Sequence, residues 1–240
     1  MVGLLDGPAQ ELAGADVSLE VLGENDNVAM ENRIRLANAG ASCINIMSSP
    51  GSGKTTLLEH TVARLPKGLH IGVIEGDMTT ELDAERLRSH GVPVAAITTG
   101  RSCHLEAEMI SAALDQLDRD VRLDQLDLVI IENVGNLICP AAYDLGEHSR
   151  VVLVATTEGE DKPLKYPIMF QGADCVVITK LDLAPYLKLD VEKLITNIRE
   201  VNGRAAIMAV SAESGEGMQL WSDWLESQIV SSSRLPAVAA

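Results

Sequence analysis

The stretch SSPGSGKTT, residues 48–56, decides the fold of this chain. An apolar run at 43–47 leads into it and a helical pattern follows, which is the strand, glycine-rich turn and helix order of a phosphate-binding loop. Glycines let successive backbone N–H groups point at an anion, and the helix N-terminus adds partial positive charge. In such a loop Lys54 reaches the β- and γ-phosphates, and Thr55 places its hydroxyl on Mg²⁺.

One position departs from the strict pattern, because Ser48 stands where its first glycine belongs. The alternative is a Gly/Ser loop with an incidental lysine. The flanking strand and helix patterns favour the phosphate loop. The residues expected to touch phosphate are Gly51, Ser52, Gly53, Lys54, Thr55 and Thr56.

Composition limits the classes of function. At 240 residues, with 46% of them hydrophobic, the chain can form one α/β domain with a substantial core. A net charge of −16 argues against sequence-independent nucleic-acid binding and against anionic membranes, since both need a cationic face. We see neither a membrane span nor a secretory signal. Four cysteines without disulfide-scaffold spacing fit reduced thiols and a cytoplasmic location.

Short apolar runs alternate with helical patterns, which predicts a mainly parallel sheet covered by helices on both faces. Residues 1–40 are expected to form an N-terminal extension with one helix, or two broken near Gly23, that packs on the core. Residues 41–230 form the P-loop domain, and 1–14 and 231–240 read as loose ends. Expected strands are 43–47, 70–75, 93–98, 127–131, 151–156, 174–179 and 205–210, and expected helices are 55–65, 79–90, 104–117, 162–171, 191–201 and 217–229.

Acidic residues follow two of the expected strands. Ligands bind beyond the carboxyl ends of parallel strands, so the loops there should share one face. Asp77, Asp83 and Glu132 could bind Mg²⁺ directly or through its waters, and Gly135 could offer its N–H to a γ-phosphate. The alternative is that these acids cap helices or loop tips.

The run Thr179-Lys180-Leu181-Asp182 ends another expected strand. Guanine presents two parallel donors that one carboxylate, Asp182, can accept, whereas adenine lacks that pair. The run resembles the NKxD guanine-specificity motif of GTPases, with Thr179 in place of Asn, a form similar to that of the signal-recognition GTPases. Ser211-Ala212 follows the next strand, as the base-contacting loop of GTPases does.

Cys103, His104 and Cys139 form the other candidate site. Cys103 and His104 are expected to open the helix at 104–117, on the same face of the sheet as Cys139. Thiolate and imidazole ligands suit Zn²⁺, Ni²⁺ or Cu, and do not suit Mg²⁺. Three ligands are too few for a closed tetrahedral site, but a two-fold dimer could double the set. The alternative is buried cysteines beside a surface histidine.

Longer stretches resemble one family, the hydrogenase nickel-incorporation GTPases of the HypB type within the SIMIBI class of P-loop proteins. The resemblance covers about residues 30–227 in the family's order. It is carried by INIMSSPGSGKTTLLE, VIEGDMTTELDAERLR, TTGRSCHLEAEMI, IIENVGNLICPAAYDLGE, ATTEGEDKPLKYP, TKLDLA and SAESGEGM.

The resemblance implies a Mg²⁺-dependent GTPase that assists nickel insertion into the large subunit of [NiFe] hydrogenase. It implies GTP-linked homodimerisation and a nickel chaperone of the HypA type as partner. By position, Lys54 and Thr55 hold phosphates and Mg²⁺, and Asp83 and Glu132 are the acids of the two switch regions, with Asp83 orienting the attacking water. Lys180 and Asp182 read guanine, and Cys103, His104 and Cys139 hold Ni²⁺ or Zn²⁺.

The chain departs from many members in having no cysteine before Cys43 and no histidine before His60. A high-affinity N-terminal nickel site is therefore not expected.

Three rival functions remain: a passive metal-binding module with a degenerate nucleotide site, an ATPase of the deviant P-loop type, and a urease-type maturation GTPase. Ser49 stands where the deviant ATPases carry a second lysine, and ENVGNLICPA fits the urease-type proteins poorly.

Overall fold

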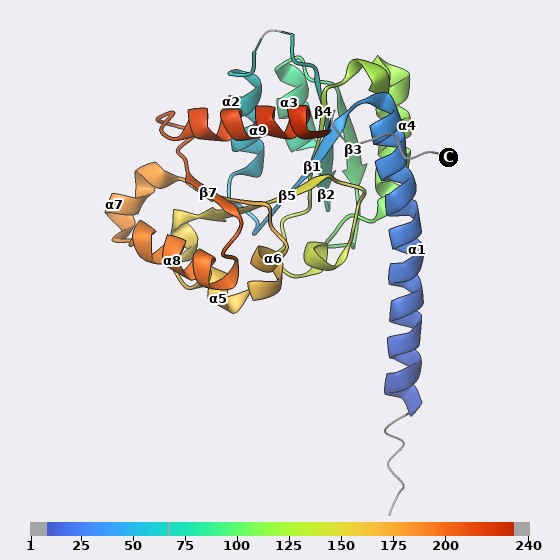
Figure 1. The fold of residues 1–240 in the computed structure, drawn as a ribbon, viewed down its shortest axis with the longest axis horizontal. Helices are drawn as coiled ribbons and strands as arrows, with labels where there is room; N and C mark the ends of the chain where they lie inside the picture. Colours follow the sequence, from blue (N-terminus) through green and yellow to red (C-terminus); the bar gives the residue numbers. More distant parts are fainter. Residues whose placement is uncertain (1–8, 67, 233–240) are drawn as a thin grey trace, which may run out of the picture.

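The computed structural model describes residues 9–66 and 68–232. Its centre is a sheet of seven strands in the order β3-β2-β4-β1-β5-β6-β7, and every neighbouring pair is parallel. The phosphate loop follows β1, the middle strand (Figure 1). The strands are β1 (Ser42–Ser48), β2 (Ile71–Asp77), β3 (Val94–Thr98), β4 (Leu128–Glu132), β5 (Ser149–Ala155), β6 (Cys175–Thr179) and β7 (Ala206–Ala209).

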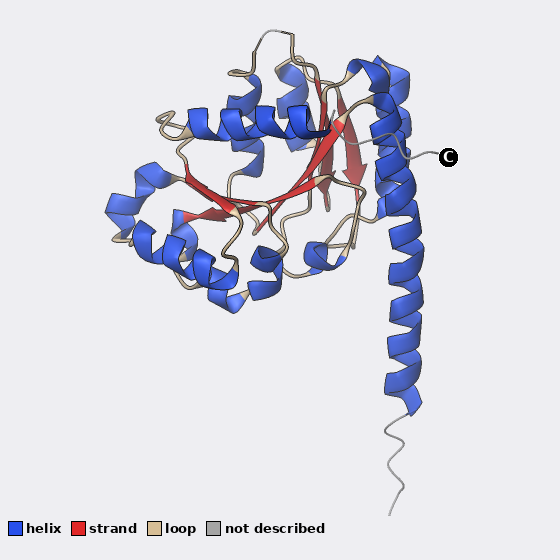
Figure 2. Cartoon of the chain, viewed as in Figure 1, coloured by secondary structure: helices blue, strands red, loops and turns tan. Residues whose placement is uncertain are grey.

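Helices connect most of the successive strands and cover both faces of the sheet (Figure 2). This arrangement confirms the expected fold class. The α-helices are α1 (Ala9–Ala39), α2 (Lys54–Val62), α3 (Leu82–Ser89), α4 (Ala107–Val121), α5 (Lys162–Lys165), α6 (Pro167–Gln171), α7 (Ala184–Leu187), α8 (Val191–Val201) and α9 (Met218–Ser232). Short 3-10 turns add Leu123–Gln125, Cys139–Ala142, Thr156–Glu158 and Leu181–Leu183.

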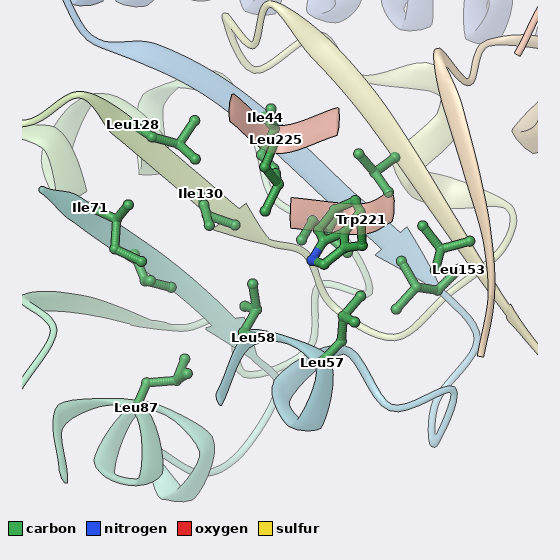
Figure 3. Packing of buried hydrophobic residues seen from close by; sticks show 14 of the residues in the cluster. Ile44, Leu57, Leu58, Ile71, Leu87, Leu128, Ile130, Leu153, Trp221 and Leu225 are labelled. Atoms are coloured by element: carbon green, nitrogen blue, oxygen red, sulfur yellow. The ribbon is translucent and has the colours of Figure 1, made fainter. Parts of the chain in front are cut away.

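The core lies in layers on the two faces of the sheet. On one face α2, α3 and α9 pack on the strands, with Leu57, Leu87 and Trp221 buried among strand residues such as Ile44 (Figure 3). On the other face α1 and α4 cover β2 and β4, while α6 and α8 cover β5 and β6. Aliphatic side chains dominate these layers, as the scarcity of aromatic residues requires.

The first helix is longer than expected. A single helix, α1, runs through Gly23 without a break, which is one of the two expected arrangements, and it includes residues 9–14, for which the sequence predicts a loose end. Its N-terminal part extends past the body of the molecule, whereas its C-terminal part packs beside α4 (Figure 1). Residues 1–8 and 233–240 lie outside the described residues, while 231 and 232 belong to α9.

Other expected helices also differ in their bounds, and three of the differences have a local cause. The expected helix 162–171 is two helices, because Pro167 disfavours helical backbone at Tyr166, which adopts φ −127°. Helix α3 begins at Leu82 because the N–H groups of Thr79 and Thr80 donate to the Asp77 carboxylate instead. Helix α4 begins at Ala107, so Cys103 and His104 lie in the preceding turn and do not open the helix.

Length and polarity together leave none of the helices in the described part of the chain able to cross a membrane.

Candidate nucleotide and metal sites

A cavity of about 590 Å³ lies beyond the carboxyl ends of the central strands. Four loops that are far apart in sequence converge on it, as the parallel topology predicts. Its walls come from the phosphate loop, the ends of β2 and β4, the start of α3, and one residue after β6. The lining includes Gly51, Gly53, Lys54, Thr55, Thr56, Glu75, Asp77, Asp83, Glu132, Gly135 and Lys180.

Lys54 begins α2 and is 9% exposed. Its ammonium donates to the Ser48 hydroxyl over 3.1 Å, so the serine that replaces the first glycine of the pattern holds the lysine. Burial lowers the pKa of Lys54 below its usual value, although the nearby carboxylates of Glu132 and Asp83 oppose that shift. A bound phosphate could replace the Ser48 hydroxyl as the acceptor of this hydrogen bond.

Two glutamates lie side by side in the cavity. Glu75 on β2 and Glu132 on β4 are register partners, and they are 2% and 3% exposed. Thr55 donates its hydroxyl to Glu132 over 2.8 Å, but one oxygen of each glutamate has no hydrogen-bond partner. Burial raises the pKa of Glu132 to about 7, and burial together with Glu132 raises that of Glu75 to about 8.

Asp77 and Asp83 complete the acidic lining at more exposed positions. Partial burial opposes ionisation of Asp77, but the donors from Thr79 and Thr80 outweigh it, so its pKa lies below the usual value. Asp83, in the first turn of α3, forms an ion pair with Arg86 over 2.9 Å. Both acids therefore have hydrogen-bonding or ion-pair partners at the mouth of the cavity.

The TKLD run is tied to the phosphate loop. Thr179 donates its hydroxyl to the Ser52 carbonyl over 2.7 Å, and Lys180 donates to the Gly51 carbonyl over 2.7 Å. Asp182 accepts from the Ser211 hydroxyl over 2.7 Å, which brings the loop after β7 to the same place. Ala212 is half-buried next to Ser211. One oxygen of Asp182 is thus fixed by Ser211.

Sequence reasoning missed two acidic residues of this region. Glu75 is one of them, and the only signal was a charged residue inside an otherwise apolar strand. Glu158 is the other: its carboxylate accepts from the hydroxyls of Ser49 over 2.5 Å and Ser52 over 2.7 Å, and from the Ala155 N–H over 2.9 Å. Glu158 therefore braces the phosphate loop from the segment after β5.

The three candidate metal ligands are brought together. The ligand atoms of Cys103, His104 and Cys139 lie within 4.8 Å of one another, and the two sulfurs are 3.0 Å apart. The His104 ring stacks on Tyr143 with 4.0 Å between centroids, and its buried Nε2 makes no hydrogen bond. Nε2 lies 3.4 Å from the Glu106 carboxylate. Thiolate sulfur and imidazole nitrogen together suit Ni²⁺ or Zn²⁺.

Two close contacts connect this ligand set to the cavity. A Cβ on Gly135 would meet the Pro50 backbone at 2.9 Å, so the segment that leads to Cys139 lies directly on the phosphate loop. A Cβ on Gly76 would meet Leu105 at 2.8 Å, so the residue after His104 packs on the strand that ends at Asp77. Both halves of the ligand set therefore adjoin residues that line the cavity.

The chain is similar to known proteins over most of its length. Residues 42–209 match the family model for the CobW/HypB/UreG nucleotide-binding domain. The hydrogenase maturation factor HypB of Escherichia coli is 49% identical over 213 residues, covering 89% of this chain and 72% of that protein. The probable hydrogenase maturation factor HypB of Methanocaldococcus jannaschii is 38% identical, covering 89% and 95%.

The chain belongs to the HypB family of hydrogenase maturation factors.

Solved HypB structures share the whole fold. HypB from Helicobacter pylori in complex with nickel matches with a TM-score of 0.84 and 39% identity, covering 89% of this chain and 98% of that one. HypB from Archaeoglobus fulgidus matches with a TM-score of 0.80 and 42% identity, covering 87% and 100%. A LAO/AO transport system kinase, at 16% identity and a TM-score of 0.52, shares the fold alone.

Proposed function

We propose that this chain is a GTP-hydrolysing metallochaperone that assists nickel insertion into the large subunit of [NiFe] hydrogenase. The observation that carries the proposal is the contact of Gly135 with Pro50, because it joins a nucleotide pocket to a transition-metal ligand set through one short segment. Membership of the HypB family supports the hydrogenase as recipient, and the nickel in the Helicobacter pylori structure supports the cargo.

The donor set in the cavity fits Mg²⁺. Glu132 and Glu75 each have a buried oxygen without a partner, and hard carboxylate and hydroxyl oxygens are the ligands that Mg²⁺ uses in nucleotide sites. Thr55, Asp77, Asp83 and Glu132 are the residues that would hold it, directly or through water. When bound with GTP, Mg²⁺ neutralises charge on the β- and γ-phosphates.

The chain's own residues supply positioning and charge. When GTP binds, the Lys54 ammonium donates to the β- and γ-phosphates instead of to the Ser48 hydroxyl. The backbone N–H groups from Gly51 to Thr56 hold the phosphate oxygens. The Gly135 N–H meets the γ-phosphate, while Asp83 orients the attacking water. We expect turnover to be slow, as in GTPases that act as regulatory switches.

Guanine selection follows from the geometry around Asp182. Ser211 fixes the carboxylate, and Lys180 reaches along the phosphate loop so that its stem can lie over the base. The Thr179 hydroxyl donates to the Ser52 carbonyl and so ties the start of the TKLD run to the phosphate loop. We therefore expect Thr179 to leave guanine selectivity intact.

Metal transfer is proposed to depend on a homodimer. One chain provides three ligands, and a symmetric interface would bring a second set to the first. Ile138, beside Cys139, is 67% exposed, which suits burial against another copy. GTP orders the 132–140 segment, so the position of Cys139 changes with the nucleotide. A HypA-type chaperone is the expected nickel donor.

The test is a Ni²⁺ titration with size measurement, carried out with GDP and with a non-hydrolysable GTP analogue. We expect a dimer and a changed Ni²⁺ affinity with the analogue. Equal affinities and equal sizes in both states would rule out the coupling.

Two of the rival functions are each tested by one further measurement. Preferential turnover of ATP over GTP would favour the deviant ATPase. A Lys54→Ala chain that matured hydrogenase normally would favour a passive metal-binding module.

A further inference from the structure

Helix α1 touches both segments that carry the metal ligands, although it contributes no ligand itself. The two contact residues are asparagines, Asn25 and Asn32, which are 9% and 2% exposed. Buried amides are costly unless their donors and acceptors are paired. The hydrogen-bond partners of these two side chains therefore show which segments the helix holds in place.

The first segment follows Cys103 and His104. Asn25 accepts from the Ala107 N–H over 2.9 Å, and Asn32 donates to the Ala107 carbonyl over 2.8 Å. Two side chains of α1 thus bind the backbone N–H and the carbonyl of Ala107, the first residue of α4. Only Leu105 and Glu106 separate that residue from His104, so its position restricts where the imidazole can lie.

The second segment follows Cys139. Asn25 donates to the Asp144 carbonyl over 2.8 Å, and Asn32 donates to the Leu145 carbonyl over 3.2 Å. Arg33 adds an ion pair with the Asp144 carboxylate over 2.8 Å. The residue before Asp144 is Tyr143, whose ring stacks on His104. A Cβ on Gly146 would meet the Ala29 carbonyl at 2.6 Å, so helix and segment are in direct contact.

We infer that Asn25 and Asn32 are positioning residues for the Cys103–His104–Cys139 site, acting together as a clamp that fixes the two ligand-bearing segments relative to each other. This inference rests on the proposed metal role of the site. Each asparagine bridges the two segments, so losing either one removes one of the two bridges and loosens one segment against the other. Groups that orient metal ligands typically change metal affinity about 10- to 100-fold when removed.

The experiment compares single variants of the full, reduced and metal-free chain. Asn25→Ala and Asn32→Ala each remove a bridge, whereas Arg35→Ala is the matched control. Arg35 lies on the same helix and pairs with Asp115 and Asp118 of α4, away from both ligand segments. Ni²⁺ affinity is measured by competition with a chelator, and the absorption spectrum of the Co²⁺ form reports ligand geometry. GTP turnover reports whether the rest of the fold is intact.

We expect both asparagine variants to bind Ni²⁺ about 10-fold more weakly, with an altered Co²⁺ spectrum and near-normal GTP turnover. Arg35→Ala should keep the affinity and the spectrum. Asparagine variants that fold and bind Ni²⁺ with unchanged affinity and spectrum would overturn the clamp while leaving the proposed function standing. If Asn32→Ala does not fold, Asn25→Ala decides alone. Absence of Ni²⁺ binding by the unaltered chain would overturn both.

Discussion

The Sγ atoms of Cys103 and Cys139 lie 3.0 Å apart, although 36 positions separate the two residues in the chain. One belongs to the turn before α4 and the other begins the 3-10 turn after β4. Parallel strands bring these two turns to the same edge of the sheet.

Removing either sulfur should destroy the metal site. Cys103→Ala and Cys139→Ala are each expected to weaken Ni²⁺ binding at least about 10-fold, because each change removes a sulfur ligand from the site. Competition with a chelator measures the loss. Cys175→Ala is the control, since Cys175 is buried on β6 in the core. Equal losses in all three variants would contradict the assignment.

Asp182→Asn should change the nucleotide that is preferred. Asparagine replaces one of the two carboxylate acceptors by an N–H donor. This donor cannot pair with the amine at C2 of guanine, but it can donate to the carbonyl at C2 of xanthine. We expect the ratio of GTP to XTP affinity to fall by about 100-fold or more. Fluorescent nucleotide competition measures both affinities. Ser211→Ala is the comparison: it should weaken binding without reversing the preference, because Asp182 loses only its fixed neighbour.

Glu158→Ala should loosen the phosphate loop. Ser49 and Ser52 both lose their acceptor, so we expect the KM for GTP to rise about 10-fold, with a smaller change in kcat. Steady-state phosphate release separates the two constants. Glu158→Gln keeps a carbonyl oxygen and should retain much of the affinity. Asp161→Ala, which removes only a surface pair with Lys165, should behave like the unaltered chain.

The Glu75–Glu132 pair predicts how stability depends on pH without Mg²⁺ and nucleotide. Their pKa values are raised from 4.5 to about 8 and about 7. Between pH 4.5 and these raised pKa values, the folded chain keeps protons on the two glutamates, whereas the unfolded chain has released them. This contribution to stability is complete below about pH 4.5 and is lost as the pH rises through 7 and 8.

Glu75→Gln removes the ionisation and should raise the Tm at pH 8 by about 2–4 °C for each kcal/mol gained. At pH 5 the gain should shrink, since Glu75 is then protonated in the folded chain. Thermal unfolding at both pH values measures this. The exposed Glu85 provides the control variant Glu85→Gln. A loss of stability at pH 8 would show that Glu75 has a partner in the folded chain.

Gly135→Ala should disturb both sites at once. The added Cβ would meet the Pro50 backbone at 2.9 Å, and neither segment can rotate a side chain to relieve the clash. We expect GTP affinity and Ni²⁺ affinity to fall together. Gly172→Ala is the control, because its Cβ would find its nearest neighbours at 3.8 and 4.0 Å. Unchanged Ni²⁺ affinity in Gly135→Ala would separate the two sites.

The sheet could be predicted from the sequence because its strands are buried on both faces and read as continuous apolar runs. Each of the seven expected strands lies within two residues of the observed bounds at either end. The phosphate loop, TKLD and Ser211 have fixed positions relative to such strands, so their convergence followed from topology.

Residues whose role depends on tertiary proximity could not be predicted. Asn25 and Asn32 read as polar positions in an ordinary helix, and only the folded chain shows that they reach across more than one segment. Glu158 belongs to a segment distant in sequence from the phosphate loop. The start of α4 was misplaced because hydrogen bonds among Thr99, Ser102 and His104 hold a turn there, a local competition that periodicity does not report.

The closeness of Cys103 and Cys139 has a consequence for redox chemistry. Two thiols 3.0 Å apart need to approach by only about 1 Å to reach the length of a disulfide bond. Dioxygen or a disulfide reagent that removes two electrons and two protons from the pair would join the sulfurs and leave His104 as the one remaining ligand. How strongly a preparation has been reduced therefore determines what fraction of its chains can take up metal.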